Sequence, residues 1–454
     1  MEKPNVIYIL ADDMGYGDFG KFNSLIHTPN LDRLVSTGCT LSNCYAASPV
    51  CAPARAAIMT GKYPQRVGAI DTLEARGLDR IKLSETTIAD VFLGNGYRTG
   101  LVGKWHNGAI DPEYHPNRRG FEEFFGFRGG WNDYYDYHVE RNGEPQACDG
   151  TYLTDLLSRE AISFVERHKE EPFFLHLAYN SPHFPFEVPE SYLDRYCEKG
   201  LPKDTAVIYG MIECMDEGIG RLLDTLERLH LREQTIVIFS SDNGPDLGHE
   251  SGLPGMNRFN ANLRGGKQLV YEGGIQVPAV ISWPGKIPAD TLSGELVHGT
   301  DWFATLMHLC HLEWDQPLAL DGIDASDALF GGKLPKRTLC WQWNRFTPEQ
   351  KCNAAIRDGD LKFIHPPVDA YLHLPKEEVD RDVDIKRHPE NYTTICTDAI
   401  PARSMPETPD EELYNLRLDK SETTNLVQEL PDHAATMKEK LYAWFSDVEK
   451  SRLS

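Results

Sequence analysis

The sequence predicts an α/β fold, a three-layer sandwich in which helices cover both faces of a large, mostly parallel sheet. Three apolar segments support this prediction, and they are NVIYIL at 5–10, PFFLHLAYNSPH at 172–183 and TIVIFSSDNG at 235–244. Each begins as a nearly continuous apolar run, as do strands that are buried on both faces. Segments with helical periodicity separate the runs, so helices are expected to connect consecutive strands.

The connecting segments define the order of the elements. Helices are expected near 29–36, directly after Cys51, near 85–93, near 151–168 and near 205–229, with a further strand in RTGLVGKWH. Ligands of such sheets gather beyond the carboxyl ends of the strands. The residues that follow each strand are therefore the place to look for a site.

The sequence pattern changes near residue 335, where the candidate strands become shorter. We expect a large domain over 1–335 and a smaller antiparallel α+β subdomain over 336–454, because the shorter strand candidates TLCWQW, NAAIRDGDLKFI and ELYNLRL precede a terminal helix near 432–450. The segment 366–410 is rich in proline and charge. It is expected to be a long surface loop that borders the site.

Composition excludes several classes of partner. The 454 residues include 69 acids against 46 lysines and arginines, a formal charge of -23, which disfavours nucleic acid and anionic membranes.

The N-terminal apolar run is too short for a signal peptide, and no later run is long enough to span a bilayer. Ten cysteines include no CxxC pair and no zinc spacing. We expect a soluble protein, cytoplasmic if Met1 is the native start and periplasmic or secreted if a leader was removed.

Paired oxygen ligands follow two of the predicted strands. Asp12 and Asp13 come directly after the first apolar run, and Asp242 and Asn243 follow the run that begins at residue 235. Adjacent carboxylates repel each other unless a cation holds them, and hard oxygen donors are the ligands of Ca²⁺ or Mg²⁺. Separately, each pair could be a turn or a helix cap. Together they predict a metal site at one edge of the sheet.

Cys51 lies where a helix begins, with Arg55 one turn further on. A thiol at a helix N-terminus feels the positive end of the helix dipole, and a nearby guanidinium lowers its pKa further. We therefore expect a reactive sulfur at Cys51. The alternative is a buried core cysteine, since free cysteines are among the most buried residues.

Cations and imidazoles follow further strand ends. Lys104 and His106 end a third strand, His183 follows a fourth, and Lys267 lies in the glycine-rich stretch LRGGKQLVYEGG. Alone, each would be a solvated lysine or a structural histidine. Together at one rim they predict an anion cage with acid and base candidates.

Seven stretches in register give the chain a resemblance to a known family. They are ADDMGYGD, TPNLDRL, CAPARAAIMTGKYP, GYRTGLVGKWH, SPHFPF, SDNG and GGKQLVYEGGIQVP. Over almost its whole length the chain resembles the type I, formylglycine-dependent sulfatases of the alkaline phosphatase superfamily, of the arylsulfatase A/B-like kind. The resemblance implies an alkaline phosphatase-like fold.

The resemblance also implies a covalent mechanism. A maturation enzyme would oxidise Cys51 to formylglycine, whose hydrate carries two hydroxyls on one carbon. One hydroxyl would attack the sulfur of a sulfate ester, and deprotonation of the other would collapse the adduct and expel sulfate. Two steps would thus replace a single difficult one.

The same resemblance implies roles for the remaining residues. Ca²⁺ would be bound by Asp12, Asp13, Asp242, Asn243 and an oxygen of the modified Cys51. Arg55 and Lys104 would hold the diol, His106 would be the base that triggers its collapse, and His183 with Lys267 would clamp sulfate and assist the leaving alcohol. Ligand types alone do not decide between Ca²⁺ and Mg²⁺.

The chain departs from the family pattern at two points. Position 54 is alanine where many members carry serine or threonine, but Cys51, the proline at 53 and Arg55 are intact, so modification is expected to survive. An export signal is also missing, whereas many bacterial relatives that act on polysaccharides are exported. A small imported sulfated sugar would suit a cytoplasmic location.

Aromatic residues suggest a sugar substrate. The segment 126–143 places Trp131, Tyr134, Tyr135 and Tyr137 beside polar groups, an arrangement that suits a sugar ring but equally a seam between subdomains. GGWNDYYDY also resembles arylsulfatase B-like enzymes, which remove the 4-sulfate of N-acetylgalactosamine. We expect an exo-acting sulfatase for a small sulfated sugar or oligosaccharide, with a hexosamine 4-sulfate as the leading substrate. Further substrate candidates in polar loops are His249, Arg258 and Asn344.

Two other functions remain open from the sequence. A phosphonate monoester or phosphodiester hydrolase could use the same aldehyde and a related cage, because phosphoryl groups are also anions. A non-catalytic protein that binds sulfated sugars could keep the cage with an unmodified Cys51. No cage residue is missing, which favours an enzyme.

Overall fold

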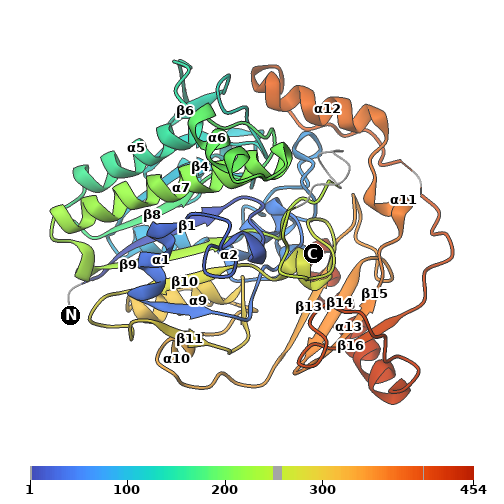
Figure 1. Cartoon of the computed structure of the whole chain (residues 1–454). Helices are drawn as coiled ribbons and strands as arrows, with labels where there is room; N and C mark the ends of the chain where they lie inside the picture. Colours follow the sequence, from blue (N-terminus) through green and yellow to red (C-terminus); the bar gives the residue numbers. More distant parts are fainter. Residues whose placement is uncertain (1–2, 249–257, 402) are drawn as a thin grey trace.

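A ten-stranded sheet forms the centre of the molecule. The structure, a computed structural model, describes residues 3–248, 258–401 and 403–454. The strand order is β11-β2-β10-β9-β1-β8-β4-β5-β6-β7 (Figure 1). The strands are β1 (Asn5–Ala11), β2 (Cys39–Leu41), β4 (Arg98–Lys104), β5 (Glu123–Phe127), β6 (Val139–Arg141), β7 (Glu144–Gln146), β8 (Phe173–Ala178), β9 (Thr235–Ser241), β10 (Ala279–Ser282) and β11 (Thr291–Ser293).

The middle of this sheet is parallel. Strands β9, β1, β8, β4 and β5 pair in parallel, whereas antiparallel pairs lie toward both edges, at β9–β10 and at β5–β6–β7. Their carboxyl ends therefore reach one rim of the sheet. The predicted mostly parallel α/β fold is confirmed, with antiparallel edge strands that the sequence patterns did not indicate.

Alternate residues of β1 face two separate cores. Ile7 and Ile9 pack with apolar residues of α1, α5 and α7, while Val6, Tyr8 and Leu10 pack with those of α2, α4 and α9. Because both faces are covered, β1 needs apolar residues at every position. The covering helices are α1 (Pro29–Ser36), α2 (Cys51–Thr60), α4 (Ile88–Gly94), α5 (Leu153–Arg167), α7 (Lys203–Arg228) and α9 (Asp301–Leu309). Shorter elements connect them, and they are β3 (Cys44–Tyr45), α3 (Pro64–Val67), α6 (Glu190–Glu198), α8 (Glu272–Ile275), β12 (Val297–His298) and α10 (Ser326–Leu329).

A four-stranded antiparallel sheet follows in the C-terminal part of the chain. Its order is β13-β14-β15-β16, and the strands are β13 (Thr338–Gln342), β14 (Ala354–Asp358), β15 (Leu361–His365) and β16 (Glu412–Asn415). Helix α13 (Pro431–Leu453) packs on one face, and the other face shares a core with α8 (Figure 1). Buried Lys362 also joins the two parts, because its Nζ lies 2.9 Å from carboxylate oxygens of both Glu272 and Glu422.

The segment 366–410 is not the long surface loop that its composition predicted. It contains α11 (Asp369–Leu372) and α12 (Lys376–Arg387), and Figure 1 shows α12 beside the β6 region. Ion pairs fix α12 in place, since Arg76 Nη2 lies 2.6 Å from Glu378 Oε1. Within the described ranges, no helix combines the length and the apolar character that crossing a bilayer requires.

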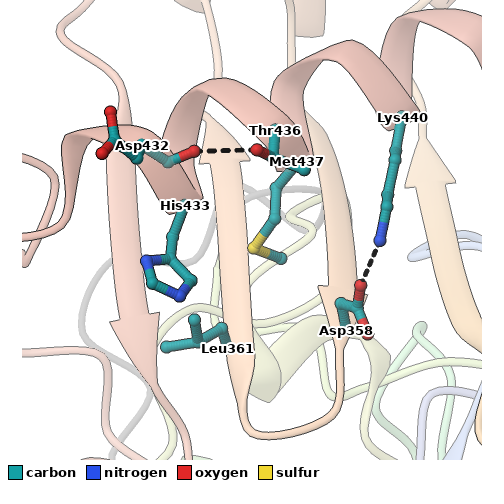
Figure 2. A pocket seen from close by; sticks show the side chains of 7 residues that line it. All are labelled: Asp358, Leu361, Asp432, His433, Thr436, Met437 and Lys440. Atoms are coloured by element: carbon teal, nitrogen blue, oxygen red, sulfur yellow. Dashed lines mark hydrogen bonds and ion pairs between the residues drawn. The ribbon is translucent and has the colours of Figure 1, made fainter.

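A surface hollow of about 480 Å³ lies between α13 and the small sheet (Figure 2). Among its lining residues, Lys440 Nζ lies 2.5 Å from Asp358 Oδ2, and Thr436 Oγ1 donates to the backbone carbonyl of Asp432 at 2.9 Å. None of its lining residues belongs to the predicted cage.

Candidate active site

The ends of β1 and β9 bring the predicted metal ligands together. The two strands are in parallel register up to their last residues, so Asp12 and Asp13 emerge beside Asp242 and Asn243. The backbone N–H of Asp13 donates to Oδ1 of Asp242 at 3.1 Å. All four side chains are buried. The topology thus gathers oxygen donors in an interior site.

Two cations lie between the carboxylates of Asp12 and Asp242. Lys104, the last residue of β4, places Nζ 2.7 Å from Asp12 Oδ2. Arg55 on α2 donates from Nε to Asp242 Oδ2 at 2.8 Å, and its Nη2 lies 3.5 Å from Asp12 Oδ1. Burial alone would raise the pKa of Asp242, but Arg55 and Lys104 outweigh burial and hold it below its usual range.

Lys267 and His183 complete the cage at Asp13. Lys267 Nζ lies 2.9 Å from Asp13 Oδ2 and 2.9 Å from His183 Nε2. His183 Nδ1 lies 2.6 Å from the carbonyl oxygen of Phe184, which can only accept, so Nδ1 carries the proton and Nε2 accepts from the ammonium of Lys267. Burial and then Lys267 lower the pKa of His183 well below its usual value, which agrees with a neutral ring.

Cys51 lies close to Asp12 and Asp242, and the pKa of its thiol differs from our expectation. It is the first residue of α2, it is 2 % exposed, and its Sγ lies within 4.8 Å of carboxylate oxygens of Asp12 and Asp242. Burial raises the pKa of the Cys51 thiol to about 12, although Lys104 and Lys267 oppose the shift. The predicted lowering of the pKa was therefore wrong, because the loss of hydration outweighs the helix terminus and nearby cations. The thiol itself is a poor nucleophile at neutral pH.

His106 lies two residues beyond the end of β4. Its Nε2 is 3.4 Å from the carbonyl oxygen of Thr72 and 3.4 Å from Glu74 Oε1. Burial and then Lys104 lower the pKa of His106 well below its usual value, so the ring is neutral and can accept a proton. His106 and Asp13 have φ of 53° and 61°, a left-handed conformation that costs energy for residues other than glycine and clusters at functional sites.

The buried oxygen donors at the ends of β1 and β9 fit a divalent cation. Oδ1 of Asp12 and Oδ1 of Asn243 are buried and have no hydrogen-bond partner among the residues that the structure describes. Such oxygen atoms, with the neighbouring Asp13 and Asp242, are the ligands that Ca²⁺ or Mg²⁺ prefers. Three aspartates are balanced by the three cations Arg55, Lys104 and Lys267, so a bound divalent ion would make the site cationic.

Two of the aromatic substrate candidates lie where a ligand could reach them. Trp131 is half-buried, with its ring 5.7 Å from that of Phe184, and it lines a cavity of about 290 Å³. Tyr135 is 39 % exposed and its ring lies 5.3 Å from that of Tyr152. Trp131 remains a candidate for stacking on a sugar ring.

The structure contradicts the substrate role that we expected for Tyr134. Its side chain is completely buried, and its hydroxyl lies 2.9 Å from the carbonyl oxygens of both Asn180 and His183. Tyr134 therefore supports the loop that carries His183. Tyr137 is also buried, with its hydroxyl 3.2 Å from Asp149 Oδ1.

Arg258 and Asn344 are both buried, and both donate hydrogen bonds to other residues of the chain. Arg258 Nη2 lies 2.7 Å from Asp18 Oδ2 and donates to the carbonyl oxygen of Asp13 at 2.8 Å, so it supports the metal-ligand loop. Asn344 is 1 % exposed, and its amide donates to the carbonyls of its neighbours Arg345 and Thr347. Asn344 is therefore not placed to bind substrate, whereas Nη1 of Arg258 is buried and has no hydrogen-bond partner among the described residues. His249 lies outside the described residues.

The cavity beside the cage includes residues that sequence reasoning missed. Its lining includes Arg128, Trp131 and Asn132, and also Glu74 and Lys386, which lie 3.3 Å apart. Glu74 lies in the stretch AIDTLEARGL, which carries no motif. Lys386 lies in the segment 366–410. The sequence predicted that this segment borders the site, and this was the one indication that it could contribute a residue.

The fold is an α/β sandwich, and at one rim of its sheet three cations lie against buried aspartates. Residues 4–312 match the family model described as Sulfatase, so the chain belongs to the sulfatase family. It is 32% identical over 366 residues to N-acetylgalactosamine-6-sulfatase of Sus scrofa, covering 74% of this chain and 68% of that protein. It is also 32% identical over 347 residues to arylsulfatase J of Mus musculus, covering 73% of this chain and 56% of that protein.

A solved structure shows the same architecture over nearly the whole chain. Ps i-CgsB in complex with k-i-k-neocarrahexaose matches with a TM-score of 0.82 and 29% identity, covering 98% of this chain and 93% of that chain. The family and its named relatives establish the chain as a sulfatase, a sulfuric ester hydrolase. The resemblance that the sequence motifs indicated is confirmed.

Proposed function

We propose that this sulfatase releases sulfate from sulfate esters of carbohydrates. The observation that carries this proposal is a cavity of about 290 Å³ lined by Trp131 and by polar groups such as Arg128 and Asn132. Its lining residue Glu74 lies 3.4 Å from Nε2 of His106, which connects the cavity to the cage. An aromatic face with hydrogen-bonding neighbours suits a sugar ring. The names of the N-acetylgalactosamine-6-sulfatase relative and of the structure solved with a neocarrahexaose support the same substrate class.

The nucleophile in this proposal is Cys51 after oxidation to formylglycine by a maturation enzyme. The high pKa of the buried thiol supports it, since the unmodified residue is a poor nucleophile at neutral pH. A formylglycine hydrate would supply an alcohol nucleophile and a second hydroxyl on the same carbon. In this proposal the bound cation is Ca²⁺, held by Asp12, Asp13, Asp242 and Asn243, and it supplies positive charge for the sulfate oxygens.

The remaining cage residues then have separate tasks. Arg55 and Lys104 orient the oxygen atoms on residue 51, because both lie against the carboxylates that surround it. Lys267 stabilises the negative charge of sulfate, and His183, whose Nε2 faces Lys267, assists the leaving alcohol. His106 is the base that removes a proton from residue 51 when sulfate is released.

The position of the sulfate group on the sugar is a finer proposal. The stretch GGWNDYYDY favours a hexosamine 4-sulfate, whereas the relative from Sus scrofa is named as a 6-sulfatase of N-acetylgalactosamine. We retain the 4-sulfate as the leading substrate and treat the 6-sulfate as its direct competitor.

Sulfate release from sugars tests the proposal. The protein, co-expressed with a formylglycine-generating enzyme, is incubated with the 4-sulfate and the 6-sulfate of N-acetylgalactosamine, and sulfate is measured by ion chromatography with Cys51→Ala as the control. We expect release from at least one sugar, and faster release from the 4-sulfate. Activity on 4-nitrophenyl sulfate alone would contradict a carbohydrate substrate. A higher rate on a phenyl phosphonate ester would favour a phosphonate hydrolase, and binding without release would favour a binding protein.

A further inference from the structure

Glu74 is a buried carboxylate that contacts three different parts of the site. It begins the short 3-10 helix η2 (Glu74–Arg76), it is 1 % exposed, and its Oε1 accepts a hydrogen bond from the backbone N–H of Gly130. The same oxygen lies 3.4 Å from His106 Nε2 and 3.3 Å from Lys386 Nζ. A buried carboxylate without partners would be expensive, so these contacts explain how it is accommodated.

The surroundings of His106 determine which ring nitrogen carries the proton. Nε2 faces the carbonyl oxygen of Thr72 and Oε1 of Glu74, each at 3.4 Å, and both oxygens accept hydrogen bonds. Nε2 must therefore be the protonated nitrogen. Nδ1 is then left with its lone pair, and it is buried with no hydrogen-bond partner in the described part of the chain. A base needs such a free lone pair.

Gly130 keeps the ring of His106 in this orientation. A Cβ atom at position 130 would lie 2.6 Å from Cε1 and 2.8 Å from Nε2 of His106, so only glycine allows this contact. The imidazole is held between the backbone of Gly130 and the acceptors Thr72 and Glu74.

Lys386 favours the ionised form of Glu74. Burial raises the pKa of Glu74 to about 7, and the charge of Lys386 is the largest effect that opposes this shift. Lys386 is itself buried on α12 and has a second partner, with its Nζ 2.6 Å from Asp382 Oδ1. Without Lys386 the pKa of Glu74 would rise further, so a protonated Glu74 could donate to Nε2 instead of accepting from it.

We propose that Glu74, held by Lys386 of α12, is a positioning residue that fixes His106 in the tautomer with the proton on Nε2 and the lone pair on Nδ1. This inference rests on the proposed role of His106 as the base. When a hydroxyl of residue 51 transfers its proton to Nδ1, the electron pair of the O–H bond stays on that oxygen and His106 becomes an imidazolium. Glu74 stabilises this charge by accepting from Nε2–H, as an orienting carboxylate does in a catalytic triad.

The tautomer can be measured without any sulfatase activity. Nitrogen-15 NMR of histidine-labelled protein separates protonated from unprotonated ring nitrogens, and comparison with His106→Gln assigns the signals of His106. We expect a protonated Nε2 and an unprotonated Nδ1 in the unmodified protein. Glu74→Leu should produce a mixture of tautomers. A proton on Nδ1 in the wild type, or an unchanged spectrum in Glu74→Leu, would overturn the proposal.

Kinetics on the matured protein provide the second measurement. Glu74→Gln and Lys386→Met should each lower kcat by about 10-fold to 100-fold with little change in KM, because the first removes the carboxylate charge that stabilises the imidazolium and the second lets Glu74 take up a proton. Glu378→Gln is the matched control, since it breaks the neighbouring ion pair between α12 and Arg76 but does not contact His106. Equal loss of kcat in Glu378→Gln and Glu74→Gln would show a merely structural effect of α12 and would overturn the proposal. A wild type that releases no sulfate would defeat the proposed function, and the NMR result would still decide the tautomer.

Discussion

Replacement of Lys267 by methionine separates sulfate binding from metal binding in the cage. Methionine keeps the length of the side chain but removes the ammonium, which lies 2.9 Å from Asp13 Oδ2 and 2.9 Å from His183 Nε2. If Lys267 stabilises the sulfate group, its loss should reduce catalysis. The ion should bind at least as well, because a competing positive charge beside the proposed ligand Asp13 disappears.

The geometry sets the size of both effects. At 2.9 Å, the Asp13–Lys267 attraction is about 6 kcal/mol at an effective dielectric constant of about 20, so removal of Lys267 frees Asp13 for a cation. Loss of one preorganised donor to a developing oxyanion lowers kcat by about 10²-fold to 10³-fold, which corresponds to about 3–4 kcal/mol. In the absence of an ion, the loss of the lysine partner of the buried Asp13 carboxylate should cost about 3–5 kcal/mol of stability.

Three assays on Lys267→Met test this reasoning. Ion chromatography measures sulfate release, isothermal titration calorimetry measures calcium affinity, and thermal unfolding with and without calcium measures stability. We expect a large loss of kcat, unchanged or tighter calcium binding, and a lowered Tm that calcium restores. Lys286→Met changes an exposed lysine and serves as the control. A loss of activity below about threefold, or a weaker affinity for calcium, would refute the reasoning.

Four further predictions concern His106, Asp242, Trp131 and Glu422. His106→Ala should leave sulfate covalently attached to the peptide that contains residue 51, because the base for its release is gone; an intact mass without retained sulfate after exposure to substrate would count against this role. Asp242→Ala should lose bound calcium and activity together, and an unchanged calcium content by atomic absorption would contradict its assignment as a ligand. Trp131→Ala should raise KM for sulfated sugars by about 10-fold or more through the loss of ring stacking, with little change for 4-nitrophenyl sulfate; equal changes for both substrates would argue against a sugar-binding role. Burial raises the pKa of Glu422 from its ordinary 4.5 to about 7, so the free energy of unfolding is larger below about pH 4.5 and falls as the pH rises to about 7. Glu422→Gln should remove about 3 kcal/mol of that dependence in urea unfolding at about pH 5 and about pH 8, and identical pH dependence in both proteins would show that the group does not titrate as described.

Much of the central sheet could be predicted because its strands are apolar on both faces. The strands β1 and β9 could be recognised because the side chains of residues 6–10 and 236–239 each enter one of two cores. The helix expected near 85–93 begins later, at Ile88, because Thr87 accepts from the backbone N–H of Asp90 and ends the preceding loop. Short strands such as β2 and the edge strand β11 carry too few residues to show a pattern.

The close approach of the proposed metal and cage residues could be predicted because each follows a strong strand signal or lies in a family motif. The substrate candidates could not be separated in the same way. Tyr134 and Asn344 are polar residues near motifs, but their partners are backbone carbonyls that only the folded chain brings close. Glu74 and Lys386 are about 300 residues apart, and their ion pair depends on the docking of α12. The pKa of Cys51 likewise depends on burial, which helix position alone does not reveal.

The mass of the peptide that contains residue 51 tests the central claim most directly. Protein co-expressed with a formylglycine-generating enzyme is digested, and the peptide is compared with that from protein made without the enzyme. The account predicts a loss of mass that corresponds to the change from thiol to aldehyde, with a hydrated form beside it, and sulfate release only from the modified sample. An unmodified thiol at Cys51 in a sample that still releases sulfate would contradict the account.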